Sequence, residues 1–171
     1  MVTANNTPAI LLFGYGNPGR GDDAVGPALI EAMQTYLDEH NHSAGIESFI
    51  DAECLTDMQL QIEHVTDLVG RDRILFIDAD MSCQEPCALR LLPPEKDDSY
   101  TTHAMSPGAL IFTYQQVYGH TAPPAYVLSI RTYAFELGDD ICDQARQNLS
   151  LAIETAKTFC SESFDDTQRK I

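Results

Sequence analysis

Short runs of consecutive apolar residues alternate with segments of helical periodicity along this chain. Each apolar run is long enough for one strand of a buried sheet, and together they predict strands at residues 9–13, 45–51, 74–77, 88–92 and 126–130. The run at 74–77, ILFI, is the most continuous, which is typical of a strand at the centre of a parallel sheet. Too few residues separate it from 88–92 for a crossover helix, so we expect that fourth strand to run antiparallel.

Between the strands, apolar residues recur at the three- and four-residue spacing of a helix face. This spacing predicts helices over residues 24–33, 60–69, 106–119 and from about 139 to 160. Ser106 and Pro107 are typical of an N-cap and a first helical residue, and Gly119 is typical of a helix end. The order of elements predicts a single α/β domain over residues 1–171, a three-layer αβα sandwich around a twisted mixed sheet of five strands. The polar or charged ends, residues 1–8 and 161–171, are expected to be loose.

The first predicted strand runs into a glycine-rich turn, FGYGNPGRGDD, at residues 13–23. Its glycines fit the G-x-G-x-x-G spacing of a loop that binds nucleotide phosphates. Two carboxylates, Asp22 and Asp23, stand where such a loop would place a phosphate at a helix N-terminus, and only Arg20 offsets their charge. Nucleotide binding is therefore disfavoured at this turn.

Aspartates also end two other predicted strands, Asp51 the second and Asp78 the third. The carboxyl ends of parallel strands meet at one edge of a sheet, where the ligand sites of α/β folds lie. A helix-capping role explains one member of the pair Asp22 and Asp23. If the other member lies near Asp78, the two carboxylates repel each other, and this arrangement favours a bound cation. His103, in the polar stretch DDSYTTHAMSP, is the candidate third ligand, and an imidazole suits a transition ion better than calcium or magnesium.

The net charge and the cysteine content limit the partners and the cellular compartment that are expected for this chain. The chain has 26 Asp and Glu residues against 10 Lys and Arg, a net charge of -16, which repels nucleic acid and anionic membrane surfaces. No stretch approaches the ~20 apolar residues of a membrane span. The five cysteines are an odd, scattered set, which favours a reducing compartment, so we expect a cytoplasmic location.

The stretches LLFGYGNPGRGDDAVGPALIEAM and ILFIDA resemble the hydrogenase maturation endopeptidases. That family shares the pattern G-x-G-N-x-x-x-x-D-[DE]-x-x-G and a strand that ends in D-A, and the resemblance extends from about residue 10 to 159. It implies a phosphorylase/hydrolase-like fold with a mixed five-stranded sheet. It also implies an endopeptidase that removes a C-terminal extension from the nickel-loaded precursor of a nickel-iron hydrogenase large subunit.

The resemblance further implies roles for individual residues. Asp23 and Asp78 become the catalytic acids and, with a histidine, the ligands of the substrate's nickel, which zinc or cadmium can replace in vitro. Substrate contacts are expected at four positions of the turn and the second strand, Gly16, Asn17, Asp22 and Asp51. The segments QLQIEH and HAMSP are similar to the branch that serves cytoplasmic NAD-linked hydrogenases, and we expect a monomer.

Two departures from the family pattern affect the site. Some members place the histidine directly after the Ser-Pro that opens a helix, where this chain has Gly108, so His103 is the nearest substitute and His64 a second candidate. Many members have a Gly-Gly-Thr-like turn where this chain reads Asp51-Ala52-Glu53-Cys54. Substrate contacts at this turn are therefore expected to differ from those of the family.

Two other functions remain as alternatives. Peptidyl-tRNA hydrolases begin with G-L-G-N-P-G, close to GYGNPG, but this chain lacks their following T-R-H-N and has the wrong charge for tRNA. A non-catalytic docking module for hydrogenase assembly would use the same metal-dependent crevice without cleavage. No Ser-His-Asp, Cys-His or H-E-x-x-H signature is recognisable, so a conventional protease nucleophile is not predicted.

Overall fold

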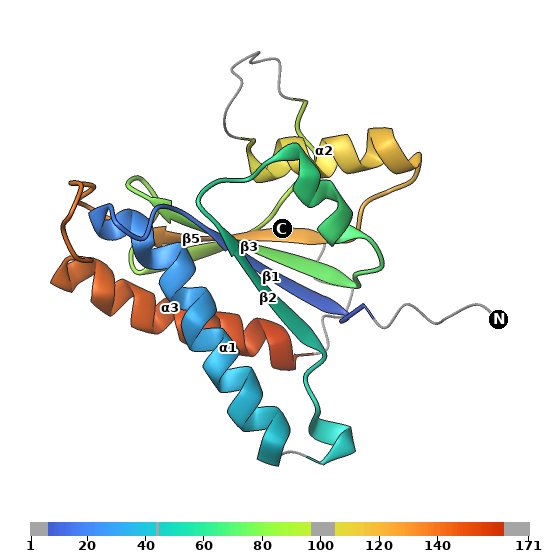
Figure 1. Ribbon diagram of the computed structural model, residues 1–171, viewed down its shortest axis with the longest axis horizontal. Helices are drawn as coiled ribbons and strands as arrows, with labels where there is room; N and C mark the ends of the chain where they lie inside the picture. The colour runs from blue at the N-terminus through green and yellow to red at the C-terminus, as the bar shows by residue number, and fades with distance from the viewer. Residues whose placement is uncertain (1–6, 44, 97–104, 163–171) are drawn as a thin grey trace.

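A computed structural model describes residues 7–43, 45–96 and 105–162 of the chain (Figure 1). Its five strands form one sheet in the order β2-β1-β3-β5-β4, with bounds β1 Ile10–Tyr15, β2 Ala52–Asp57, β3 Arg73–Asp80, β4 Cys87–Leu91 and β5 Ala125–Arg131. The strands β1, β2, β3 and β5 are parallel, and β4 runs antiparallel to β5. The central place of β3 and the antiparallel fourth strand were both predicted correctly.

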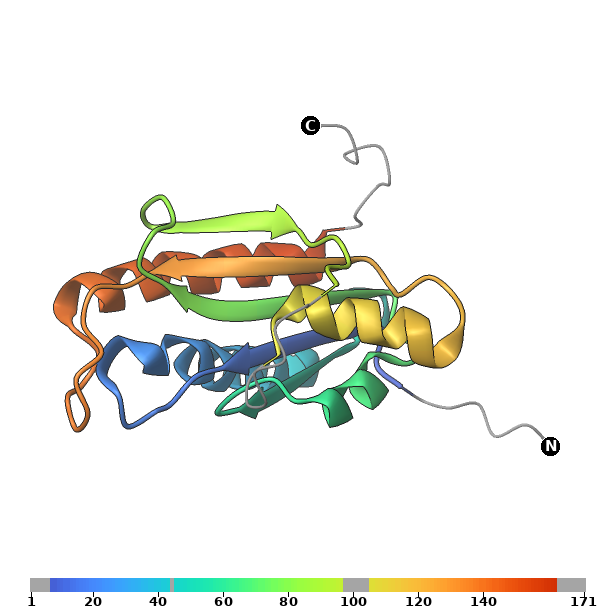
Figure 2. The same cartoon turned by 90° about the horizontal axis from the view of Figure 1, so that it is seen from above.

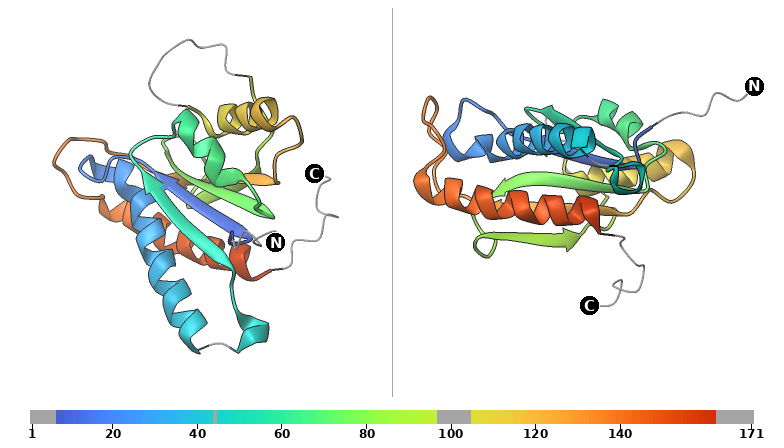
Figure 3. Two further views of the ribbon diagram at one scale, coloured as in Figure 1. Left: turned by 45° about the vertical axis from the view of Figure 1, so that its right-hand side comes forward. Right: turned by 90° about the horizontal axis from the view of Figure 1, so that it is seen from below.

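Helices cover both faces of the sheet, as the views in Figures 2 and 3 show. The long helices α1 (Val25–Ser43) and α3 (Asp143–Ser161) pack on one face, and α2 (Pro107–Tyr118) with the 3-10 helix η3 (Ile62–Leu68) packs on the other. Two further 3-10 turns are η1 (Gly21–Ala24) and η2 (Ile46–Ser48). The predicted α/β sandwich with a mixed five-stranded sheet is confirmed. Within the described residues, no helix has the length and apolar character that crossing a membrane requires.

The central strands are apolar throughout because each face of the sheet is buried. On β3, Leu75 and Ile77 face α1 and α3, whereas Ile74 and Phe76 face η3 and α2. All four side chains are fully buried. A strand buried on both faces has no reason to alternate apolar and polar residues, which is why ILFI was recognisable from sequence.

Helix α2 begins and ends as its local chemistry predicts. The Ser106 side chain accepts a hydrogen bond from the Ala109 N–H at 3.1 Å, and Pro107 is the first helical residue. Gly119 ends the helix in the left-handed conformation, with φ of 72°. The first residues of α2 line one pocket together with Asp78 and Asp80 of β3 and Ser129 of β5.

The prediction of a strand at residues 45–51 was wrong, because β2 begins only at Ala52. Ile50 is buried, but its main-chain N–H and C=O are bonded by the side chain of Asn41 rather than by a neighbouring strand. The true strand, AECLTD, lies at the sheet edge and is half-buried, so it lacks the apolar run of β3. The predicted helix at 60–69 is the 3-10 helix η3, α1 continues to Ser43, and α3 starts at Asp143 rather than near 139.

Candidate functional site

Two glycines allow α1 to start in contact with the carboxyl end of the sheet. A Cβ atom on Gly14 would lie 2.5 Å from the Gly26 carbonyl oxygen, and a Cβ on Gly26 would lie 2.4 Å from the Tyr15 carbonyl oxygen. The latter would also lie 3.2 Å from the carbonyl oxygen of Ile77 on β3. Only glycine fits at either position, and this close packing places the acids of η1 beside the ends of β1 and β3.

The glycine turn holds the Asp23 carboxylate in a fixed orientation. Gly16 has φ of 142°, and a Cβ on it would lie 2.0 Å from the Asp23 carbonyl oxygen, so only glycine lets the chain turn here. The Asn17 main-chain N–H donates to Asp23 Oδ2 at 2.8 Å. Asp23 is half-buried, and its other carboxylate oxygen has no hydrogen-bond donor among the described residues.

Asp78 lies near the end of β3, on the face that η3 and α2 cover. The Tyr15 hydroxyl donates a hydrogen bond to its carboxylate. Burial raises the pKa of Asp78 to about 6, the hydrogen bonds from Tyr15 and the Ala79 N–H oppose this rise, and the charges of Asp80 and Asp23 add to it. Burial, followed by the charge of Asp78, also raises the pKa of Tyr15, which keeps the phenol protonated as a donor. Asp23 and Asp78 therefore converge closely enough for one charge to affect the other.

Asp22 has a different role from its neighbour. It is 0% exposed, and its carboxylate accepts the N–H groups of Tyr133 (2.8 Å), Ala134 (3.0 Å) and Cys142 (2.8 Å). Burial would raise the pKa of Asp22, but the hydrogen bonds from Cys142, Tyr133 and Ala134 outweigh burial and lower it. The prediction that one member of the pair Asp22 and Asp23 caps a helix was wrong for η1, because no side chain caps it. Asp22 instead ties the glycine turn to the loop between β5 and α3.

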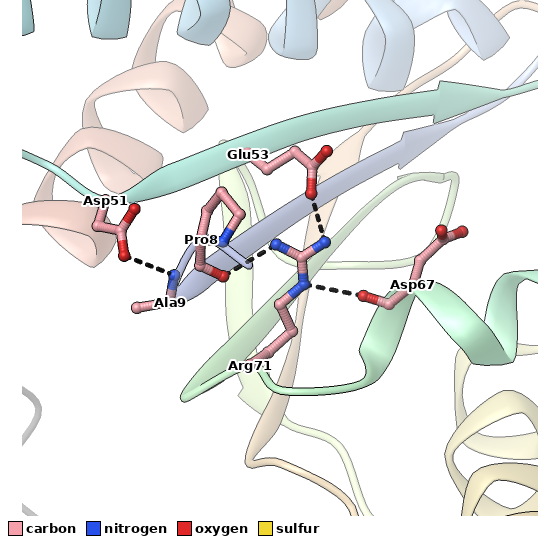
Figure 4. Close-up of polar contacts among 6 residues, drawn as sticks. All are labelled: Pro8, Ala9, Asp51, Glu53, Asp67 and Arg71. Atoms are coloured by element: carbon pink, nitrogen blue, oxygen red, sulfur yellow. Dashed lines mark hydrogen bonds and ion pairs between the residues drawn. The ribbon is translucent and has the colours of Figure 1, made fainter. Parts of the chain in front are cut away.

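Asp51 lies at the opposite end of the sheet from Asp23 and Asp78. It precedes β2 rather than ending it, and its carboxylate accepts the Ala9 N–H at 3.0 Å (Figure 4). At the same end, Arg71 donates to the Pro8 carbonyl at 2.9 Å and pairs with Glu53. The reason for grouping Asp51 with Asp23 and Asp78 is therefore lost. The second strand ends six residues later than predicted, and its last residue is Asp57.

His64 is close to the crevice, but both of its ring nitrogens are occupied. Nδ1 accepts the Gln61 main-chain N–H at 3.0 Å, so the ring hydrogen is assigned to Nε2, which lies 3.2 Å from Asp57 Oδ2. The ring also packs edge-on against Phe13, with centroids 4.8 Å apart. In this arrangement no nitrogen lone pair of His64 is free to coordinate a metal ion.

The predicted third ligand, His103, lies outside the described residues, so its place in the site stays a prediction. Within residues 7–43, 45–96 and 105–162, no group of three or more His, Cys, Asp and Glu side chains is arranged to hold a metal ion. The described residues bring two acids of the predicted set, Asp23 and Asp78, near each other.

A pocket of about 270 Å³ opens beside Asp78. We call it the Asp78 pocket, and its polar lining comes from Tyr15, Asp78, Asp80, Arg90, Glu95, Ser106 and Ser129. A Cβ on Gly108 would lie 3.0 Å from the Cβ of Glu95, so Glu95 covers the position at which some members of the resembled family carry a histidine. The sequence patterns gave no signal for Tyr15, Arg90 or Glu95, because each enters the pocket from a different element.

No protein-family model matches the chain, and no curated protein matches it in sequence. Solved structures do match its fold. The [NiFe] hydrogenase maturation protease HycI from Thermococcus kodakarensis is 17% identical, with a TM-score of 0.64 over 91% of this chain and 94% of that one. The hydrogenase maturating endopeptidase HybD from E. coli is 19% identical, with a TM-score of 0.59 over 86% of this chain and 88% of that one. At such identities the likeness shows a shared fold across most of the chain.

Proposed function

We propose that this protein is an endopeptidase that removes a C-terminal extension from the nickel-loaded precursor of a nickel-iron hydrogenase large subunit. The observation that carries the proposal is the convergence of Asp23 and Asp78 at the carboxyl end of the sheet. Two neighbouring carboxylates repel each other, and a cation bound near both removes that repulsion. The shared fold with hydrogenase maturation proteases supports the proposal independently of these two residues.

In this proposal the nickel ion belongs to the substrate, and Asp23 and Asp78 are both its ligands and the catalytic acids. Nickel can polarise a nearby carbonyl or water as a Lewis acid. The protein orients its own ligands beforehand, since the Asn17 N–H holds one oxygen of Asp23 and the Tyr15 hydroxyl holds the Asp78 carboxylate. His103 is proposed as the third ligand, because both ring nitrogens of the other candidate, His64, are engaged.

Substrate contacts are proposed at two residues of the glycine turn, Gly16 and Asn17, of which Gly16 is buried and Asn17 half-buried. The Asp22 carboxylate already accepts three main-chain N–H groups and Asp51 lies at the far end of the sheet, so neither is retained as a contact. The partner is the large-subunit precursor, which a monomer of this protein would meet in the cytoplasm, and zinc or cadmium would substitute for nickel at the same ligands in vitro. The segments QLQIEH and HAMSP favour a precursor from an NAD-linked hydrogenase.

The proposal is tested by incubating the purified protein with nickel-loaded large-subunit precursor and measuring the masses of the products. We expect the wild-type protein to release a C-terminal peptide and Asp23→Asn to release none, while both remain folded by circular dichroism. If the wild-type protein binds the precursor without shortening it, the endopeptidase proposal is wrong and the docking module is favoured.

A further inference from the structure

Arg90 brings a positive charge into the Asp78 pocket. It lies on β4, the antiparallel edge strand, and is the only cation among the described residues that line the pocket. Arg90 is exposed, and the acidic residues that line the same pocket are Asp78, Asp80 and Glu95. The chain has a net charge of -16, so a positively charged side chain among these acids suggests a specific role for Arg90.

The guanidinium is oriented by a short chain of hydrogen bonds. Arg90 Nη2 donates to Ser129 Oγ at 3.3 Å, and the buried Ser129 hydroxyl donates in turn to the Asp80 carboxylate. Asp80 is itself fixed by the Ser82 main-chain N–H at 2.7 Å and the Cys83 N–H at 3.1 Å. The remaining N–H groups of Arg90 have no hydrogen-bond partner in the described part of the chain, so they are available to a ligand in the pocket.

Amide cleavage requires a group that stabilises the negative charge developing on the carbonyl oxygen. The acids Asp23 and Asp78 cannot do this, because they carry the same sign of charge. A guanidinium presents several N–H donors in a fixed plane and stays protonated at any working pH. Arg90 therefore has the chemistry that the two acids lack, in the same pocket as Asp78.

We propose that Arg90 binds the carbonyl oxygen of the amide bond to be cleaved and stabilises the oxyanion that forms there. This inference rests on the proposed function. Water forms the new C–O bond, and the carbonyl π electrons move onto the oxygen that Arg90 binds. As the intermediate collapses, the C–N bond breaks and the leaving nitrogen takes the proton that the water has lost, so that atoms and charge balance.

The test measures kcat and KM for processing of nickel-loaded precursor by Arg90→Gln, Arg90→Lys and a matched control. Loss of one oxyanion donor lowers kcat by roughly 100-fold or more, so we expect that fall in Arg90→Gln with KM nearly unchanged. Arg90→Lys keeps the charge but loses the planar donors, so its kcat should fall by about 10-fold. The control is Lys157→Gln on α3, which removes one positive charge at a pair with Glu154 outside the pocket and should keep wild-type kcat.

Each outcome decides the inference. Wild-type kcat in Arg90→Gln, or a rise in KM alone, would overturn the role of Arg90 and leave the proposed function intact. Failure of the wild-type protein to cleave the precursor would overturn the proposed function and this inference together. Thermal melting checks that the variants fold. If Arg90→Gln does not fold, the kcat of Arg90→Lys tests the inference instead. A wild-type kcat in Arg90→Lys would contradict the inference.

Discussion

Asp22 and Cys142 are 120 positions apart in the chain and are joined by two hydrogen bonds at the end of the sheet. The Asp22 carboxylate accepts the Cys142 main-chain N–H at 2.8 Å and its thiol at 3.2 Å. Cys142 is the N-cap residue of α3, so this contact joins the glycine turn to the start of the last helix. The glycine turn that holds the neighbouring acid, Asp23, is therefore anchored to the start of α3.

Replacement of Asp22 by Asn should destabilise the fold. The Asp22 carboxylate accepts the main-chain N–H groups of Tyr133, Ala134 and Cys142. In Asn one of the two oxygens is replaced by an NH₂ group, which cannot accept, so at least one buried N–H loses its partner. We expect the free energy of unfolding to fall by about 2 kcal/mol or more. Urea unfolding at pH 7 measures this loss. Asp23→Asn is the control, because Asp23 accepts only the Asn17 N–H among the described residues and its replacement should leave the stability nearly unchanged.

The stability difference between the wild-type protein and Asp22→Asn should depend on pH, because the pKa of Asp22 is lowered in the folded protein. A carboxyl whose pKa is lowered in the folded state stabilises the fold above its unfolded pKa of about 3.9, and this contribution is lost as the pH falls toward the folded pKa. The difference in unfolding free energy between the wild-type protein and Asp22→Asn should therefore be largest at pH 7 and shrink below about pH 4. A difference that stays constant from pH 7 to pH 3 would contradict this account of Asp22.

Gly26→Ala should separate α1 from the strand ends. Its Cβ would meet the Tyr15 carbonyl oxygen at 2.4 Å, and neither backbone can move without displacing the other, so we expect a loss of about 1–3 kcal/mol in thermal or urea unfolding. Gly45→Ala provides the matched control. Gly45 has φ of -72° and no atom within 4 Å of its added Cβ, so that variant should be no less stable than the wild-type protein. Equal losses in the two variants would refute the close-packing explanation.

Tyr15→Phe should impair processing without unfolding the protein. The variant keeps the ring but removes the hydroxyl that donates to Asp78. Hydrogen bonds that orient metal ligands commonly affect affinity or activity by about 10- to 100-fold, so we expect a loss in this range in both nickel affinity and processing rate. Calorimetric nickel titration and a processing assay measure the two effects. Tyr36→Phe on α1, whose ring contacts Lys157, is the control that should change neither.

Measurements of nickel binding and of stability should show which of His103 and His64 is the metal ligand. His103→Ala is expected to weaken nickel binding by at least about 10-fold. His64→Ala should leave nickel binding nearly intact and instead lower the stability by about 1 kcal/mol, because its imidazole accepts the Gln61 N–H at the start of η3 and contacts Asp57. The reverse pattern, with nickel binding lost only in His64→Ala, would identify His64 as the ligand.

Features set by local chemistry were predictable from the sequence. The β3 run identified the central strand because both faces of it are buried. Ser106 and Gly119 marked the ends of α2 because the Ser106 hydroxyl caps the first turn and Gly119 adopts the left-handed backbone that ends the last one. Strand β2 could not be found in this way. It is a half-buried edge strand, and the apolar segment before it is bonded through Asn41 instead of a strand.

Contacts between distant parts of the chain were beyond the sequence patterns. Tyr15 on β1 donates to Asp78 on the neighbouring strand β3, 63 positions later, and the donors to Asp22 lie more than 100 positions away. The helix cap predicted for one member of the pair Asp22 and Asp23 was wrong, since no side chain caps η1 and the donors to Asp22 come from the loop after β5. Motif spacing located the acids, and only the fold separated the buried one from the half-buried one.

The most direct test of the proposed function compares precursor with and without nickel. Wild-type protein is incubated with both forms at equal concentration, and intact-mass spectrometry follows the loss of the C-terminal extension. If Asp23 and Asp78 recognise the substrate's nickel, the loaded precursor is shortened and the nickel-free precursor stays at full length. Equal shortening of the two forms would contradict the account, because the converging carboxylates would then have no metal to recognise.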